Sequence, residues 1–145
     1  KLAYANSHVI DENGAIVGDY LGSDYLTALS ITRWSTSYKV PAEQEINDAL
    51  GIKDTILNVS AVLFRRYEMD PLVRSTLHEM ESSGDWYFIV QAIKGGEVYY
   101  DARKLNYHRR HSESVIGKLL KSNKVETFYK EMSIVHQTVA ENYAL

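Results

Sequence analysis

Residues 86–107 have the sequence WYFIVQAIKGGEVYYDARKLNY, and this stretch decides the fold that we predict. Trp86–Ile93 and Glu97–Tyr107 are both rich in β-branched and aromatic residues, which favour strands. The Lys94–Gly96 segment between them supplies two adjacent glycines for a turn. We therefore predict a long β-hairpin over about 86–107. Its first strand, which is apolar on both faces, is expected at the centre of an antiparallel sheet.

The second run of this hairpin separates two kinds of side chain. A strand turns successive side chains to opposite faces of the sheet. The apolar face consists of Val98, Tyr100 and Ala102 and is expected to lie against the core. The opposite face presents polar and aromatic side chains to solvent, namely Tyr99, Asp101, Arg103 and Tyr107. This solvent face is therefore a candidate binding surface.

The C-terminal part of the chain predicts helices. Ser114–Lys121 fits a short helix and Val125–Tyr143 a longer one. The longer segment carries an apolar stripe at helical spacing, which predicts that one side of it packs on the sheet. The stripe consists of Val125, Phe128, Tyr129, Met132, Val135, Val139 and Tyr143. We therefore expect an α+β fold in which an antiparallel sheet, centred on the hairpin, has two C-terminal helices packed on one face.

The first half of the chain predicts shorter strands. Asn13–Gly14 lies between His8–Ile10 and Ala15–Val17, and this pattern is typical of a tight hairpin. Residues 25–38 mix Thr, Ser and aromatic residues and favour a strand weakly. Residues 55–67 fit either a strand or a helix, and their β-branched residues favour the strand.

Two helices are predicted among these strands. The first begins at Pro41 and ends at Gly51, a residue type that suits a left-handed helix cap. Its buried face is expected to consist of Ile46, Ala49 and Leu50. The second covers Leu72–Met80, directly after a proline that can open a helix.

The composition is that of one compact domain. The chain has 145 residues, of which 45% are hydrophobic and 24% charged, and it contains no repeat or linker-like stretch. We therefore expect residues 1–145 to form a single domain. No apolar run approaches the ~20 residues of a membrane-spanning helix, so a soluble domain is expected. The chain begins at Lys1 rather than at a methionine, which indicates a piece of a longer chain or a processed product.

The absence of cysteine excludes several classes of protein. A disulfide scaffold, a cysteine nucleophile and a zinc site with thiolate ligands all require that residue. The glycines also lack the spacing of a dinucleotide-binding or P-loop motif. We therefore expect no cofactor, no metal site and no catalytic residue. The location in the cell stays open, with the cytoplasm slightly favoured.

A basic segment stands out from the acidic background. The whole chain has a net charge of −3, whereas residues 103–124 carry a net charge of +6. Fixed cations bind phosphates or carboxylates, and exposed aromatic rings stack on bases. We therefore expect a non-catalytic binding or regulatory module that engages nucleic acid or an acidic protein surface through residues 99–121. The candidate contact residues are Tyr99, Arg103, Tyr107, His108, Arg109, Arg110, Lys118 and Lys121.

Two other functions stay open, and a homo-oligomer is compatible with any of them. His108 and His111 are three residues apart, so with Asp101 they could serve a small metal-assisted or His-dependent hydrolase or nuclease. An isolated histidine pair seldom forms an active site, so this alternative ranks below binding. The second alternative is a protein-interaction or sensory domain of a larger, membrane-anchored protein.

Overall fold

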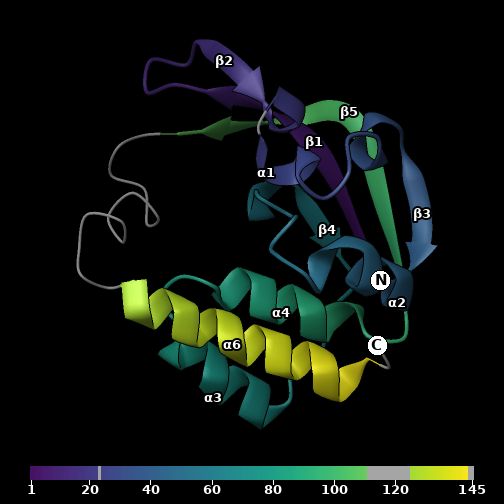
Figure 1. Cartoon of the computed structure of the whole chain (residues 1–145), viewed down its shortest axis with the longest axis vertical. Coiled ribbons are helices and arrows are strands. Elements are labelled where there is room, and N and C mark those ends of the chain that lie inside the picture. Colours follow the sequence, from purple (N-terminus) through teal and green to yellow (C-terminus); the bar gives the residue numbers. More distant parts are fainter. Residues whose placement is uncertain (23, 111–124, 144–145) are drawn as a thin grey trace.

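The structure is a computed structural model that describes residues 1–22, 24–110 and 125–143. Figure 1 shows a curled sheet and, below it, a group of three helices that lie side by side. These helices are α3 (Pro71–Glu79), α4 (Gly84–Ile93) and α6 (Val125–Asn142). The predicted α+β class is confirmed.

The sheet is mixed, whereas the prediction was antiparallel. Its strand order is β2-β1-β5-β3, and β4 also pairs with β1. The central strands β1 and β5 run parallel, and every other described pairing is antiparallel. The strands are β1 (Leu2–Ile10), β2 (Ile16–Asp19), β3 (Tyr38–Pro41), β4 (Val62–Phe64) and β5 (Glu97–Arg109). The N-terminal strand therefore takes the place that was predicted for residues 86–93.

The predicted 86–107 hairpin is wrong in its first half. Trp86–Ile93 belongs to helix α4, and most of its residues are buried. A run that is apolar on every side suits an enclosed helix as well as a central strand, and the ten residues of α4 are a length more typical of a helix. The two glycines then connect a helix to a strand, with Gly95 at a φ of 63° that favours glycine.

The second half of that stretch is confirmed as strand β5. Val98 and Tyr100 are buried and Ala102 is half-buried, so the predicted core face is largely correct. The strand partners differ from the prediction, because β5 pairs with β1 along its length and with β3 only at its start. The pairing with β1 is irregular between Asp101 and Asn106, where β5 has more residues than β1.

The long C-terminal helix is confirmed, but it packs on α4 rather than on the sheet. The second half of its apolar stripe is buried, ending at Val139 and Tyr143. The Tyr143 hydroxyl donates to the Val90 carbonyl of α4 at 2.6 Å. The largely apolar α4 can bury two sides, so it takes the contact that was predicted for the sheet. The predicted helix Ser114–Lys121 lies outside the described residues.

The N-terminal hairpin is confirmed. β1 and β2 pair across the Asp11–Gly14 turn, in which Gly14 has a φ of 90°. The Asp11 carboxylate stabilises this turn by accepting from the amides of Asn13 and Ala15, each at 2.9 Å. The turn therefore forms from the Asx and glycine chemistry that its sequence indicates.

Two of the weaker strand predictions fail over most of their length. Residues 25–38 contain α1 (Asp24–Thr27) and the 3-10 turn η2 (Arg33–Ser35), and β3 begins only at Tyr38. Residues 55–67 contain the 3-10 turn η4 (Val59–Ala61) and only three strand residues, those of β4. Neither segment has an alternation long enough to specify a strand against local turn preferences.

The two early helices are confirmed. The first consists of α2 (Ala42–Glu45) and a continuing π-helical turn, Ile46–Leu50, and its predicted apolar face is fully buried. Gly51 has a φ of −78°, so the predicted left-handed cap is wrong. A glycine is needed at position 51 for a steric reason instead, because a Cβ atom there would lie only 2.6 Å from the Ile46 carbonyl oxygen. The second helix is α3, whose first turn is capped by Asp70. None of the described helices is long and apolar enough to cross a membrane.

Candidate functional site

The last candidate residues of β5, from Tyr107 onward, lie at the end of the sheet that points away from the helices (Figure 1). β3 pairs only with Glu97–Tyr100, so the later residues of β5 have β1 as their one neighbouring strand within the described part of the chain. The register places Tyr107 beside His8 and Arg109 beside Ile10. The sheet edge and its last residues are therefore accessible to a partner.

An exposed aromatic pair marks this end of the sheet. The rings of His8 and Tyr107 are stacked, with centroids 5.3 Å apart and an interplanar angle of 22°. Tyr107 keeps 60% of its surface exposed, as does Leu105. Tyr99 is also exposed, but it lies eight residues earlier on β5, beside Lys39 of β3. The predicted surface therefore divides, since eight strand residues span roughly 25 Å.

The candidate cation Arg103 and its neighbour Lys104 are both neutralised by nearby carboxylates. Arg103 donates to the nearly buried carboxylate of Asp101, with Nη2 2.6 Å from Oδ2. These hydrogen bonds lower the pKa of Asp101 to about 2. Lys104 lies 2.5 Å from the Asp19 carboxylate of β2. Either side chain would therefore have to give up its present ion pair before it could neutralise a charge on a partner.

The arginine pair that follows is only partly engaged. Arg109 Nη1 donates to the carbonyls of Asp11 and Glu12, at 2.8 and 2.7 Å, and so holds the β1–β2 turn against the end of β5. Among the described residues these carbonyls are the only hydrogen-bond partners of the guanidinium, and they do not neutralise its charge. Arg110 is exposed, its backbone amide donates to Ile10, and its side chain has no ion pair among the residues that the structure describes. The arginine pair therefore supplies the accessible positive charge of this region.

His108 is tied into the fold. Its Nδ1 atom forms a short hydrogen bond with the Tyr20 hydroxyl. Burial, reinforced by the positive charge of Arg110, lowers the pKa of His108. The neutral imidazole is therefore the stable form at neutral pH.

The remaining candidates do not complete a catalytic site. His111, Lys118 and Lys121 lie outside the described residues, and Asp101 is occupied by Arg103. No group of three metal-binding side chains occurs within residues 1–22, 24–110 and 125–143. The hydrolase alternative therefore gains no support from the described residues.

A buried ionic network escaped the sequence prediction. Glu45 of α2 is fully buried and accepts from Arg33 Nη2 at 2.7 Å. The Tyr4 and Tyr38 hydroxyls lie 2.6 Å apart and both lie 3.3 to 3.4 Å from the same Glu45 oxygen, so one hydroxyl donates to the other and the second donates to the carboxylate. Arg33 also pairs with the more exposed Asp48, at 3.0 Å. The Pro-Ala-Glu-Gln-Glu sequence gives no sign of this burial, because acidic residues commonly fill the exposed first turn of a helix.

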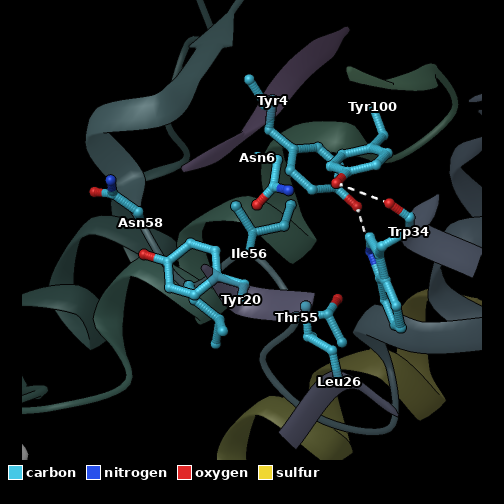
Figure 2. Close-up of a pocket in the computed structure, with 11 residues that line it drawn as sticks. Tyr4, Asn6, Tyr20, Leu26, Trp34, Thr55, Ile56, Asn58 and Tyr100 are labelled. Carbon is cyan, nitrogen blue, oxygen red and sulfur yellow. Dashed lines mark hydrogen bonds between the residues drawn. The ribbon is translucent and has the colours of Figure 1, made fainter. Parts of the chain in front are cut away.

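A small recess beside this network also escaped prediction (Figure 2). Two of its side chains, Asn6 and Thr55, are buried and each has a polar atom with no hydrogen-bond partner among the described residues. The lining comprises Tyr4, Ala5, Asn6, Tyr20, Leu26, Trp34, Thr55, Ile56, Leu57, Asn58 and Tyr100. Its lining residues come from at least four separate segments of the chain, so no local sequence motif indicates it.

Comparison of the chain with protein-family models, with curated proteins and with solved structures found no match.

Proposed function

We propose that the chain is a non-catalytic binding module whose partner is an acidic protein surface. The contact region, here called the strand-end surface, consists of His8, Tyr107, Arg109 and Arg110. The observation that carries the proposal is the exposed Tyr107 ring, stacked on His8 and followed by two arginines. Tyrosine and arginine are the side chains most enriched where protein partners bind.

The local balance of charge favours a protein over a nucleic acid. Arg103 and Lys104 are already paired with Asp101 and Asp19, and Arg109 contacts the turn that carries the acidic residues Asp11 and Glu12. Nucleic-acid binders usually present a continuous basic stripe that contacts many phosphates. The strand-end surface instead has only a few cations, and exposed apolar side chains of β2 and β5 lie in the same strands or the adjoining hairpin. These are Ile16, Val17 and Leu105, each at least 57% exposed.

The first experiment titrates the protein with fluorescent polyanions and follows their anisotropy. One probe is a labelled random copolymer of glutamate and tyrosine, and the other is labelled single-stranded oligothymidine. We expect the copolymer to bind, and we expect Tyr107→Ala to weaken its binding about tenfold, as loss of a central aromatic contact does. Arg110→Ala should weaken it severalfold, and more at low salt.

The chain offers matched controls for both variants. Tyr129 on α6 is 62% exposed, so Tyr129→Ala removes an equally accessible ring from another surface. Arg65→Ala/Arg66→Ala removes a second exposed arginine pair, which follows β4. Neither control should change the affinity. Equal losses in the controls, or no binding of either probe at low salt, would overturn the proposal.

The salt dependence separates the two classes of partner. If oligothymidine binds and the copolymer does not, the partner is a nucleic acid. Two arginine–phosphate contacts to a single strand would then give a slope of about −1.4 in log affinity against log salt. A much steeper slope would place the main contacts outside the strand-end surface.

A further inference from the structure

The recess beside β1 has the properties of a small binding site. Figure 2 shows it enclosed by β1, by the segments that carry Tyr20, Leu26 and Trp34, and by the irregular segment at 55–58. The space open to the centre of a water-sized group is about 20 Å³. Such a volume accepts one or two groups of that size. The occupant must therefore be very small, or must insert only a head group.

Two buried hydrogen-bonding groups in the recess lack partners among the described residues, the Asn6 Nδ2 amide and the Thr55 hydroxyl. Both residues are at least nine-tenths buried, at 3% and 2% exposure. The Asn6 Oδ1 atom accepts from the Ser7 amide at 2.8 Å, and this contact fixes which end of the side-chain amide faces the recess. Figure 2 shows both groups turned toward the interior of the site.

The polar groups of the aromatic lining residues Tyr4, Trp34 and Tyr100 already have hydrogen-bond partners. Trp34 Nε1 donates to the Tyr4 hydroxyl at 3.1 Å, and the Tyr100 hydroxyl donates to the Trp34 carbonyl at 3.2 Å. Asn58 bonds to Ser7 and Ser60. The lining atoms that still lack a hydrogen-bond partner among the described residues are therefore the Asn6 amide nitrogen, which needs an acceptor, and the Thr55 hydroxyl, which can donate or accept.

The lining also specifies the charge of the occupant. All eleven lining residues are uncharged types, and most of their surface is aromatic or aliphatic. An ion would lose its hydration in this recess without gaining a counter-ion. A neutral group that both accepts and donates hydrogen bonds meets no such penalty.

We propose that this recess binds a small neutral molecule, either water or a carboxamide head group, which accepts from the Asn6 amide and hydrogen-bonds to the Thr55 hydroxyl. Both occupants have the same hydrogen-bonding chemistry and differ in source, one being solvent and the other a ligand. The site is separate from the strand-end surface and does not depend on the function proposed for it.

The test uses nuclear magnetic resonance on the isotope-labelled chain, with formamide and formate as matched probes. The two molecules have nearly the same size, but only formamide is neutral. For a carboxamide site we expect formamide to shift the Asn6 side-chain amide resonances saturably, and formate to leave them unchanged. If water is the occupant, a long-lived water gives a cross-relaxation signal to the Asn6 amide, and formamide has no effect.

Thr55→Val is the decisive variant, because it replaces the hydroxyl by a methyl group of similar size. We expect it to weaken formamide binding about fivefold, or to remove the water signal. Thr76→Val is the control, since the Thr76 hydroxyl already donates to the Leu72 carbonyl within α3. Asn6→Asp, which keeps an acceptor for the Ser7 amide, serves as a second variant.

Three results would overturn the proposal. The first is the absence of both a formamide shift and a water signal. The second is equal binding of formate and formamide, which would show that the site does not select neutral groups. The third is a rise in melting temperature for Thr55→Val with no loss of either signal, because an unsolvated hydroxyl is better replaced by a methyl group.

Discussion

At the scale of single residues, the fully buried Glu45 carboxylate needs a counter-charge to stay ionised inside the fold. Its counter-charge is Arg33, whose guanidinium also lies 4.8 Å from the centre of the Tyr38 ring. A buried ion pair adds little net stability compared with an apolar pair of similar size, but removal of one partner leaves the other uncompensated. The network therefore fixes how the 33–38 segment docks on α2 more than it adds stability.

Glu45→Gln should accordingly lower the free energy of unfolding by about 3 kcal/mol, because Arg33 keeps only the more exposed Asp48 as a counter-charge. The double variant Arg33→Met/Glu45→Gln should cost clearly less than the sum of the two single changes. Urea denaturation of the four proteins measures both values. Glu43→Gln, on the exposed side of α2, is the control. Additive costs would show that the two side chains do not interact.

At the scale of elements, Glu131 joins α6 to the turn between α3 and α4. Its carboxylate accepts from the backbone amides of residues 81–83 at 2.7 to 3.0 Å and from the Ser82 hydroxyl at 2.6 Å. Those amides include the free N–H groups before α4, which favour an anion. Burial raises the pKa of Glu131, but the hydrogen bonds outweigh it and the net pKa is lowered.

Glu131→Gln should lower the free energy of unfolding by about 1–3 kcal/mol at neutral pH, since charge-assisted hydrogen bonds are lost. A carboxylate with a lowered pKa stabilises the fold above its unfolded value and loses this contribution as the pH falls through the folded pKa. The difference between the two proteins should therefore shrink below about pH 4. Glu141→Gln is the control, because Glu141 is exposed on the same helix and bonds only to Gln137 among the described residues. Denaturation curves at several pH values would contradict this assignment if the difference stayed constant.

The elements also show what the sequence can predict. β5, the N-terminal hairpin, α3 and α6 carry local signals in their periodicity, caps or turn residues, and all four were located from them. The segment that became α4 carries no such signal, because a run that is apolar on all sides fits two kinds of element. The parallel pairing of β1 with β5 joins residues about a hundred positions apart, and local patterns contain no record of it.

In the candidate site, too, local features could be predicted from the sequence and contacts between distant segments could not. Exposure of Tyr107 and Arg110 could be predicted from strand alternation and charge. Neutralisation of Lys104 could not, because Asp19 reaches it only through the fold. Nor could the recess, whose unpartnered groups come from β1 and from a loop fifty residues later. Contacts between distant segments decide which charges and hydrogen bonds remain available to a ligand.

At the scale of the whole molecule, two half-buried groups give stability opposite dependences on pH. Burial, with the nearby Asp85 carboxylate, raises the pKa of Asp54 to about 7. The folded state then holds this proton more tightly than the unfolded state, so Asp54 lowers stability as the pH rises from about 4 to 7. His108 has a lowered pKa, so its contribution is complete above about pH 6.5 and is lost as the pH falls toward the folded value.

Because Asp54 has the larger pKa shift, we expect the stability of the chain to fall as the pH rises from about 4 to 7, with His108 offsetting part of this fall below about pH 6.5. Asp54→Asn should reveal the contribution of His108. It removes the buried charge and keeps an oxygen for the Ile56 amide, which Asp54 accepts at 3.2 Å. The variant should be more stable by about 1–3 kcal/mol at pH 7 and unchanged near pH 4, allowing for partial solvent screening. The exposed Asp24→Asn is the control. Urea denaturation across this range tests the assignment. If Asp54→Asn gains no stability at pH 7, the Asp54 carboxylate is charged and solvated in the folded state and does not cause the pH dependence.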